Sequence, residues 1–264
     1  MDLYKQLFNT NLNNINYNDM ITDIDIKNEL KSYDKSCSCG QNYVSNLKLE
    51  NWGGVGDDLN NKKMGWSYRK LYEEILRLKP KTLLEAGAGG GINIKILYSL
   101  FNKQGHKTEM MYCVENAKNH YEQILENIHT RYTVNKPHIR IPEEEIRVFH
   151  DSIHRIPLPD NSIELVFSHA VLAHIPYIPV IKVIQELARI SSKYIFHIEH
   201  KNTDVNIQVS GYTKHKVNKL CLNYPKIYNL LGFKTLIYEE RVLDYNNSPT
   251  NKQVMCIFLG QKDN

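Results

Sequence analysis

Leu83-Leu84-Glu85-Ala86-Gly87-Ala88-Gly89-Gly90-Gly91-Ile92-Asn93 is the most informative stretch of this chain. A short apolar run ends in an acidic residue, turns through several glycines and continues into a predicted helix. Glycine allows the backbone to take a positive φ or to approach a ligand closely. The start of a helix adds free N–H groups and the positive end of the helix dipole. A strand, a glycine-rich turn and a helix in this order therefore predict a seat for a nucleotide-like cofactor.

Strands and helices are expected to alternate after this turn, which predicts an α/β fold with a parallel sheet wound on both sides. An entry helix begins near Ser67 and stops at Pro80. The segment between the last two strands is too short for a helical crossover, so these strands should pair as an antiparallel hairpin. The predicted strands span residues 82–86, 110–115, 145–150, 162–168, 193–199, 234–240 and 252–259. The predicted helices span residues 91–102, 116–129, 177–191 and 213–231.

Four motifs in order resemble a known family. They are Glu85 to Gly91, then Tyr112-Cys113-Val114-Glu115-Asn116, then Phe149-His150-Asp151-Ser152, and finally Leu165 to Pro176. Their spacing is similar to that of the class I S-adenosylmethionine-dependent methyltransferases. The resemblance implies a Rossmann-like, seven-stranded, mostly parallel sheet with a reversed final hairpin, and it implies S-adenosylmethionine as the cofactor. The last motif is similar to methyltransferases that act on sugars and other small molecules.

The resemblance covers residues 68–260, which predicts two parts. Residues 66–264 would form the S-adenosylmethionine-binding methyltransferase domain. Residues 1–65 are rich in Asn and Asp and carry only short apolar clusters, so we expect an N-terminal helical and loop segment that acts as a cap or lid.

Cofactor contacts are expected along the ends of the first four strands, where ligands collect in open α/β sheets. Glu115 would bind the ribose hydroxyls and Glu85 would lie near the methionine ammonium, and the resemblance places Asp151 with Ser152 beside the adenine. Asp151 as a simple turn former and Arg69 as an exposed helix residue are alternatives. The full expected set is Tyr68, Arg69, Glu85, Gly87, Ala88, Gly89, Gly91, Glu115, Asn116, Asp151, Ser152, Ser168 and His169.

Histidines dominate the predicted chemistry. Methyl transfer needs the acceptor, methyl and sulfur in line, and an oxygen acceptor usually also needs a base. His174, which follows the fourth strand, is the leading candidate, and His200 and Glu199 at the end of the fifth strand come next. The alternative is that His174 packs on the cofactor or caps the next helix. The spacing of these residues predicts no metal site.

Composition narrows the partners. A net charge of +4 and the lack of a basic stripe argue against nucleic acid as a partner. The sequence has no apolar run of about 18 residues, the length that a membrane span needs, and it starts without a secretory signal. We therefore expect a cytoplasmic protein. The five cysteines are scattered and read as reduced thiols. The oligomeric state stays open, with a homodimer as one option.

The sequence therefore predicts methyl transfer from S-adenosylmethionine to a polar small molecule, with O-methylation of a sugar or nucleotide-linked sugar as the first choice. An N-methyltransferase that acts on a small amine is the nearest rival. A non-catalytic protein that binds the cofactor is another alternative. An NAD-dependent oxidoreductase fits less well, because of the final hairpin and the Asp151-Ser152 pair.

Overall fold

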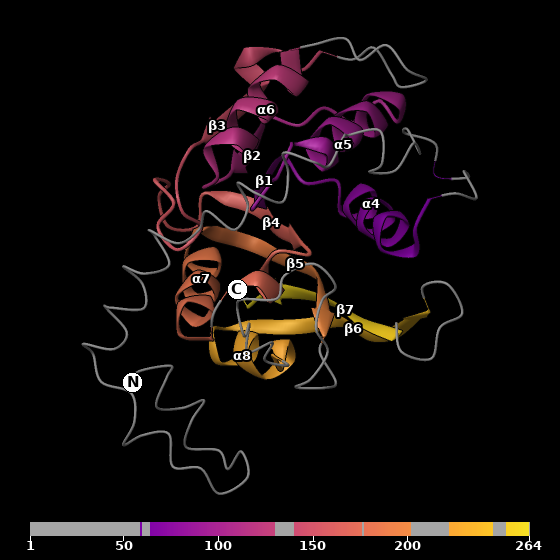
Figure 1. Cartoon of the computed structure of the whole chain (residues 1–264), viewed down its shortest axis with the longest axis vertical. Helices are drawn as coiled ribbons and strands as arrows, with labels where there is room; N and C mark the ends of the chain where they lie inside the picture. The colour runs from indigo at the N-terminus through magenta and orange to yellow at the C-terminus, as the bar shows by residue number, and fades with distance from the viewer. Residues whose placement is uncertain are drawn as a thin grey trace, which may run out of the picture.

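The computed structural model describes residues 59, 64–129, 140–175, 177–201, 222–244 and 252–263. These residues form one seven-stranded sheet in the order β3-β2-β1-β4-β5-β7-β6 (Figure 1). Neighbouring strands from β3 to β5 are parallel, whereas β7 pairs antiparallel with both β5 and β6. The strands are β1 (Thr82–Ala86), β2 (Met110–Val114), β3 (Ile146–Phe149), β4 (Ile163–His169), β5 (Ser191–Lys201), β6 (Phe233–Asp244) and β7 (Lys252–Lys262).

Helices cover both faces of this sheet. Buried side chains of α4, α5 and α6 pack on one face, and those of α7 and α8 pack on the other. Two short 3-10 turns, η3 (Glu143–Glu145) and η4 (Leu172–His174), precede β3 and follow β4. The helices are α4 (Trp66–Leu78), α5 (Ile92–Lys103), α6 (Lys118–His129), α7 (Tyr177–Ile190) and α8 (Tyr224–Leu230).

The two-sided burial explains the apolar runs in the sequence. Leu83 and Leu84 are adjacent in β1, and both have 0% of their surface exposed. Successive strand residues point to opposite faces, so Leu83 joins the core under α4 and α5 while Leu84 joins the core under α7 and α8. A central parallel strand therefore needs apolar residues at consecutive positions.

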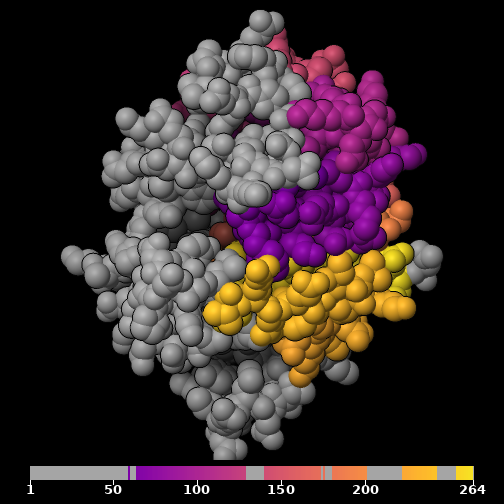
Figure 2. All heavy atoms as spheres, turned by 90° about the vertical axis from the view of Figure 1, so that its right-hand side faces the viewer, coloured from indigo at the N-terminus to yellow at the C-terminus, as the bar shows by residue number. Residues whose placement is uncertain are grey.

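The expected final hairpin is confirmed: β6 and β7 pair antiparallel from Phe233↔Lys262 to Asp244↔Lys252. β7 inserts between β5 and β6, so β6 lies at one edge of the sheet and β3 at the other. Figure 2 shows α4 and the hairpin side by side on one face of the molecule. The guanidinium of Arg241 lies 5.1 Å from the ring centre of Trp66, which joins them directly.

The predicted cap of residues 1–65 lies outside the described residues, except for Leu59, Met64 and Gly65. Met64 is buried against the core under α4. The helix predicted over residues 213–231 is described only from residue 222, where α8 occupies Tyr224–Leu230. Across the described ranges, no helix combines the length and apolar character needed to cross a membrane.

Candidate functional site

The glycine-rich turn joins β1 to α5 at the carboxyl edge of the sheet. Gly87 and Ala88 donate their N–H groups to the carbonyl oxygen of Val114 at 2.9 and 3.1 Å, which ties the turn to the end of β2. Gly87 has a φ of 70°, and a Cβ on it would lie 2.6 Å from Cγ1 of Val171. Gly89 has a φ of 54°, and a Cβ there would meet nothing within 4 Å. The turn is therefore tightly packed at Gly87 and open at Gly89.

Glu115 lies directly after β2 and is 9% exposed. Its Oε2 accepts a hydrogen bond from the N–H of Gly89 at 2.8 Å, and its Oε1 accepts one from the N–H of Ala117 at 2.9 Å. His120 Nδ1 lies 3.6 Å from Oε1. Each carboxylate oxygen accepts more than one hydrogen bond. Glu115 is thus held beside the glycine turn and retains capacity to accept hydroxyl donors.

Glu85 is buried in β1, on the other side of the turn. Its Oε1 accepts a hydrogen bond from Asn93 Nδ2 at 2.7 Å, and Asn93 Oδ1 accepts one from the Tyr72 hydroxyl at 2.8 Å. Among the described residues, Glu85 Oε2 has no hydrogen-bond partner. Burial raises the pKa of Glu85 from 4.5 to about 8, with a further rise from nearby Glu115 and against the lowering effect of hydrogen bonds from Asn93 and from the backbone of Ile94. A buried carboxylate with a free oxygen is suited to a cationic partner.

Asn93 and Tyr72 were missed by the sequence reasoning. Asn93 is the second residue of α5, and Tyr72 comes from the buried face of α4. A polar residue in the first turn of the helix that follows a glycine motif is the available signal for Asn93. No comparable signal exists for Tyr72, because its spacing marks it only as a core residue.

Asp151 and Ser152 follow β3, beside the end of β2. Asp151 Oδ1 accepts a hydrogen bond from its neighbour's N–H, that of Ser152, at 2.7 Å and pairs with Arg155 at 3.4 Å. The side chain of His150 reaches the backbone oxygen of Asn116 at 3.1 Å. Asp151 thus lies at a bend after β3, where Ser152 and Arg155 contact its carboxylate. The contact with adenine stays a prediction.

Ser168 and Glu199 lie together inside the protein, at the ends of β4 and β5. Both are 0% exposed, and the Ser168 hydroxyl donates to Glu199 Oε1 at 2.7 Å. Glu199 also accepts the N–H groups of Val171, Leu172 and Ala173. These hydrogen bonds are made inside the protein, away from solvent. Ser168 and Glu199 are therefore better placed to hold the backbone of the turn after β4 than to contact a ligand.

His169, His200 and Tyr68 lie on the opposite face of the same two strands. The rings of Tyr68 and His169 meet edge to face with their centres 4.5 Å apart. Burial lowers the pKa of His169 from 6.5 to about 4, and His200 lowers it further. His169 and His200 are therefore close enough to interact electrostatically, and each is partly exposed. Glu199 and His200 are consecutive, so they point to opposite faces of β5.

Arg69 and His174 are the remaining expected site residues. Arg69 Nη1 donates to the carbonyl oxygen of Leu59 at 2.6 Å, so the guanidinium reaches the segment before α4. The backbone of His174 ends η4 after β4, but its side chain lies outside the described residues. The role predicted for His174 therefore stays a prediction.

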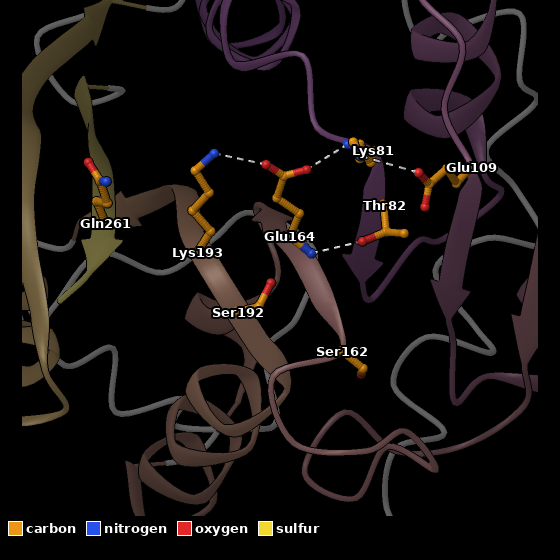
Figure 3. Close-up of a pocket in the computed structure, with 8 residues that line it drawn as sticks. All are labelled: Lys81, Thr82, Glu109, Ser162, Glu164, Ser192, Lys193 and Gln261. Carbon is orange, nitrogen blue, oxygen red and sulfur yellow. Dashed lines mark hydrogen bonds and ion pairs between the residues drawn. The ribbon is translucent and has the colours of Figure 1, made fainter. Parts of the chain in front are cut away.

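A separate hollow of about 590 Å³ lies at the amino ends of β1, β4 and β5, the opposite edge of the sheet (Figure 3). Its centre is Glu164, which accepts Lys193 Nζ at 3.0 Å and the N–H of Lys81 at 2.7 Å. These groups satisfy one another, and none of the predicted site residues lines the hollow. Within the described residues no cluster of three or more His, Cys, Asp or Glu side chains is arranged to hold a metal ion.

Comparison with known proteins agrees with this geometry. Residues 84–193 match a family model described as a methyltransferase domain. No curated protein matches the sequence. Magnesium protoporphyrin IX methyltransferase (ChlM) from Synechocystis PCC 6803, solved with bound S-adenosylhomocysteine (SAH), is similar in structure. It has a TM-score of 0.56 and 10% identity, and the match covers 88% of this chain and 97% of that chain.

Two further solved structures show how broadly the fold is shared. A putative sarcosine dimethylglycine methyltransferase from Galdieria sulphuraria has a TM-score of 0.53 and 17% identity, covering 74% of this chain and 84% of its own. The [4+2]-cyclase SpnF has a TM-score of 0.51 and 12% identity, covering 73% of this chain and 80% of its own. Because a protein named as a cyclase shares the fold, these likenesses speak to architecture and not to the acceptor.

Proposed function

Because this chain is a class I S-adenosylmethionine-dependent methyltransferase, we propose that it methylates a hydroxyl group of a polar small molecule, such as a sugar or a nucleotide-linked sugar. The observation that best supports this proposal is that Tyr68, His169 and His200 lie together at the carboxyl ends of β4 and β5. In open α/β sheets this edge is where ligands bind. Imidazoles there offer an acceptor hydroxyl both hydrogen-bonding partners and a route for its proton.

The residues around the glycine turn fit S-adenosylmethionine, the cofactor of this enzyme class. Bound there, it supplies an electrophilic methyl group on a sulfonium. The free, buried Oε2 of Glu85 is suited to the ammonium of its methionine part. Glu115, held by the N–H groups of Gly89 and Ala117, is suited to the ribose hydroxyls. The open position at Gly89 leaves room for a ligand against the backbone.

The same geometry supports the proposed roles on the acceptor side. With its pKa lowered to about 4, His169 is neutral near pH 7 and can orient a hydroxyl. That low pKa also makes it a weak base, so His200 and His174 are the proposed bases. Glu199, predicted as a third candidate, takes a positioning role in this proposal because its carboxylate is enclosed by four donors. Tyr68 would form an aromatic wall beside His169.

Binding and turnover test this proposal separately. Calorimetry with S-adenosylmethionine and SAH measures cofactor binding. A mass-shift screen with the donor present then compares sugars, nucleotide-linked sugars and small amines. We expect a gain of one methyl group on a hydroxyl-bearing acceptor. Methylation of amines alone would replace the proposal with N-methylation, and cofactor binding without any product would favour a non-catalytic role.

Histidine variants identify the base. His200→Gln and His174→Gln are compared with the exposed, remote substitution Glu122→Gln on α6. Loss of a general base lowers kcat by roughly a hundredfold or more while SAH affinity is retained. If both histidine variants keep full turnover with a hydroxyl acceptor, neither is the base.

A further inference from the structure

Four buried side chains form a continuous hydrogen-bonded chain that links α8 to the turn after β4. The hydroxyl of Tyr228 lies 2.6 Å from His197 Nε2, and His197 Nδ1 lies 2.8 Å from Ser168 Oγ. Ser168 Oγ in turn donates to Glu199 Oε1 at 2.7 Å. All four residues are 0% exposed. Tyr228, His197, Ser168 and Glu199 are called the relay below.

The donors and acceptors of the relay run in one direction. Ser168 gives its only proton to Glu199, so His197 Nδ1 must donate to Ser168 Oγ. His197 Nε2 is then the acceptor for the Tyr228 hydroxyl. Burial lowers the pKa of His197 to about 3, which agrees with a neutral ring. Every proton of the relay therefore points towards the carboxylate of Glu199.

The Glu199 end of the relay holds the backbone of the turn after β4. Ala170 leaves the strand with a φ of 57°, a left-handed conformation that non-glycine residues rarely adopt. The next three N–H groups, those of Val171, Leu172 and Ala173, donate to Glu199 at 3.2, 3.0 and 3.4 Å. Such hydrogen bonds to a charged acceptor offset the strain at Ala170.

The turn also contacts the glycine turn, because Val171 occupies the space that a Cβ on Gly87 would need. We propose that the relay is a positioning device, in which Glu199 holds Val171 against Gly87 and thereby sets the shape of the cofactor turn. This inference rests on the proposed function, because it takes the glycine turn as the seat of the methyl donor. It gives Ser168 and Glu199 a role exerted through the turn rather than through contact with the ligand.

The surroundings of Glu199 make this positioning sensitive to pH. Burial raises its pKa from 4.5 to about 7, against the lowering effect of Ser168 and the three N–H groups. The titratable groups that face it are His197 on its own strand, Tyr228 on α8 and Cys256, its pairing partner on β7. Protonation of Glu199 removes the negative charge that the N–H groups share. The turn should therefore loosen as the pH falls through about 7.

A pair of serine variants provides the test. Ser168→Ala removes the relay hydroxyl. Ser191→Ala removes an equally buried hydroxyl at the amino end of β5, where Ser191 donates to the carbonyl oxygen of Tyr194 at 3.0 Å. Ser168→Ala deletes two buried hydrogen bonds and Ser191→Ala deletes one, so a larger loss of thermal stability is expected in Ser168→Ala. Hydrogen exchange of the amides of residues 171–173 and the Kd for SAH are then compared.

The expected result is a roughly fivefold or larger loss of amide protection at residues 171–173 in Ser168→Ala, together with a comparable rise in the Kd for SAH. Ser191→Ala should leave both unchanged. Tyr228→Phe removes the hydroxyl at the α8 end of the relay, keeps the ring packing and should shift both readouts in the same direction. Equal amide protection at residues 171–173 in Ser168→Ala and Ser191→Ala would overturn the proposal.

Glu199→Gln checks the charge. Protection of residues 171–173 in the wild type, corrected for intrinsic exchange, should fall between pH 8 and pH 6 around the pKa of about 7. In Glu199→Gln it should stay flat and low. A flat wild-type profile would rule out the carboxylate as the anchor. Amide exchange needs no ligand, so its outcome is separate from whether SAH binds or an acceptor is methylated.

Discussion

Val171 fills the space directly opposite Gly87, so that a Cβ on Gly87 would come within 2.6 Å of Val171 Cγ1. The contact joins two segments far apart in the sequence, the glycine turn after β1 and the turn after β4. Both turns lie at the carboxyl edge of the sheet, because β1 and β4 are parallel neighbours. The cofactor turn is therefore shaped as much by the second turn as by its own glycines.

Replacing Gly87 by alanine should weaken SAH binding strongly and destabilise the fold. The new Cβ adds both a clash with Val171 and the strain of a φ of 70°. Gly105→Ala is the matched control, because Gly105 has a φ of 66° and no atom within 4 Å of the added Cβ. Thermal unfolding should show a loss of folding stability of about 1–3 kcal/mol from strain in both variants. Calorimetry measures the affinity for SAH. Additional destabilisation and lost affinity are expected only in Gly87→Ala. Equal behaviour of the two variants would show that Val171 is not a barrier.

Glu115→Gln should raise the Kd for SAH by about tenfold to a hundredfold, because hydrogen bonds to a charged acceptor contribute roughly 1.5–3 kcal/mol each. The melting temperature should fall as well, because Gln keeps an acceptor oxygen for only one of the two backbone N–H groups that Glu115 accepts. Glu122→Gln, on the exposed side of α6, is the control for the loss of one negative charge. Calorimetry decides: unchanged affinity in Glu115→Gln would remove this residue from the cofactor site.

Binding of S-adenosylmethionine at pH 7 should release protons. With a pKa of about 8, Glu85 is mostly protonated before binding, and a cationic ammonium beside its free oxygen lowers that pKa. The release should approach roughly one proton per site. It is measured as the difference in binding enthalpy between phosphate and Tris buffers. Glu85→Gln should release none, and a buffer-independent enthalpy in the wild type would contradict the contact between Glu85 and the ammonium.

The same carboxyl group should make stability depend on pH. Because the pKa of Glu85 is raised in the folded state from 4.5 to about 8, the unfolded chain ionises first and stability falls as the pH rises through this window. Glu199, with a pKa of about 7, acts in the same direction. His169 and His197 have lowered pKa values, so they cost stability only below about pH 6.5.

The range from pH 6.5 to pH 8 therefore isolates the carboxyl groups. The free energy of unfolding of the wild type should fall by up to about 2 kcal/mol more than that of Glu85→Gln across this range. Urea unfolding at each pH measures the difference, with Glu122→Gln as the control for charge. Parallel pH profiles for wild type and Glu85→Gln would mean that Glu85 is ionised in the folded protein.

The arrangement of strands was largely readable from the sequence. The runs around Leu83 and Val166 are apolar without alternation, which is typical of strands covered on both faces. The predicted seven strands, final hairpin, entry helix and first three later helices agree with the structure over the described residues, with ends shifted by a few positions, whereas the helix predicted over 213–231 is described only as the shorter α8. β5 and β6 extend further than predicted because β7 pairs with them along their length.

The functional groups were less predictable. The glycine motif identified Glu85, but its surroundings come from the tertiary structure: Asn93 binds one carboxylate oxygen, and burial raises the pKa. Ser168 and Glu199 were expected to face ligand and acceptor, because they end strands at the ligand edge. The alternation of side chains along β4 and β5 instead brings His169 and His200 to one face and Ser168 and Glu199 to the other.

The local sequence pattern was enough to predict the class of fold and the position of the cofactor turn, because apolar periodicity and glycine turns depend on a few neighbouring residues. Tertiary structure alone decided that β7 inserts between β5 and β6, that Val171 meets Gly87, and that Glu199 accepts the backbone of the turn after β4. Each of these contacts joins residues distant in sequence, and the geometry that pairs them arises only when the strands are assembled into one sheet.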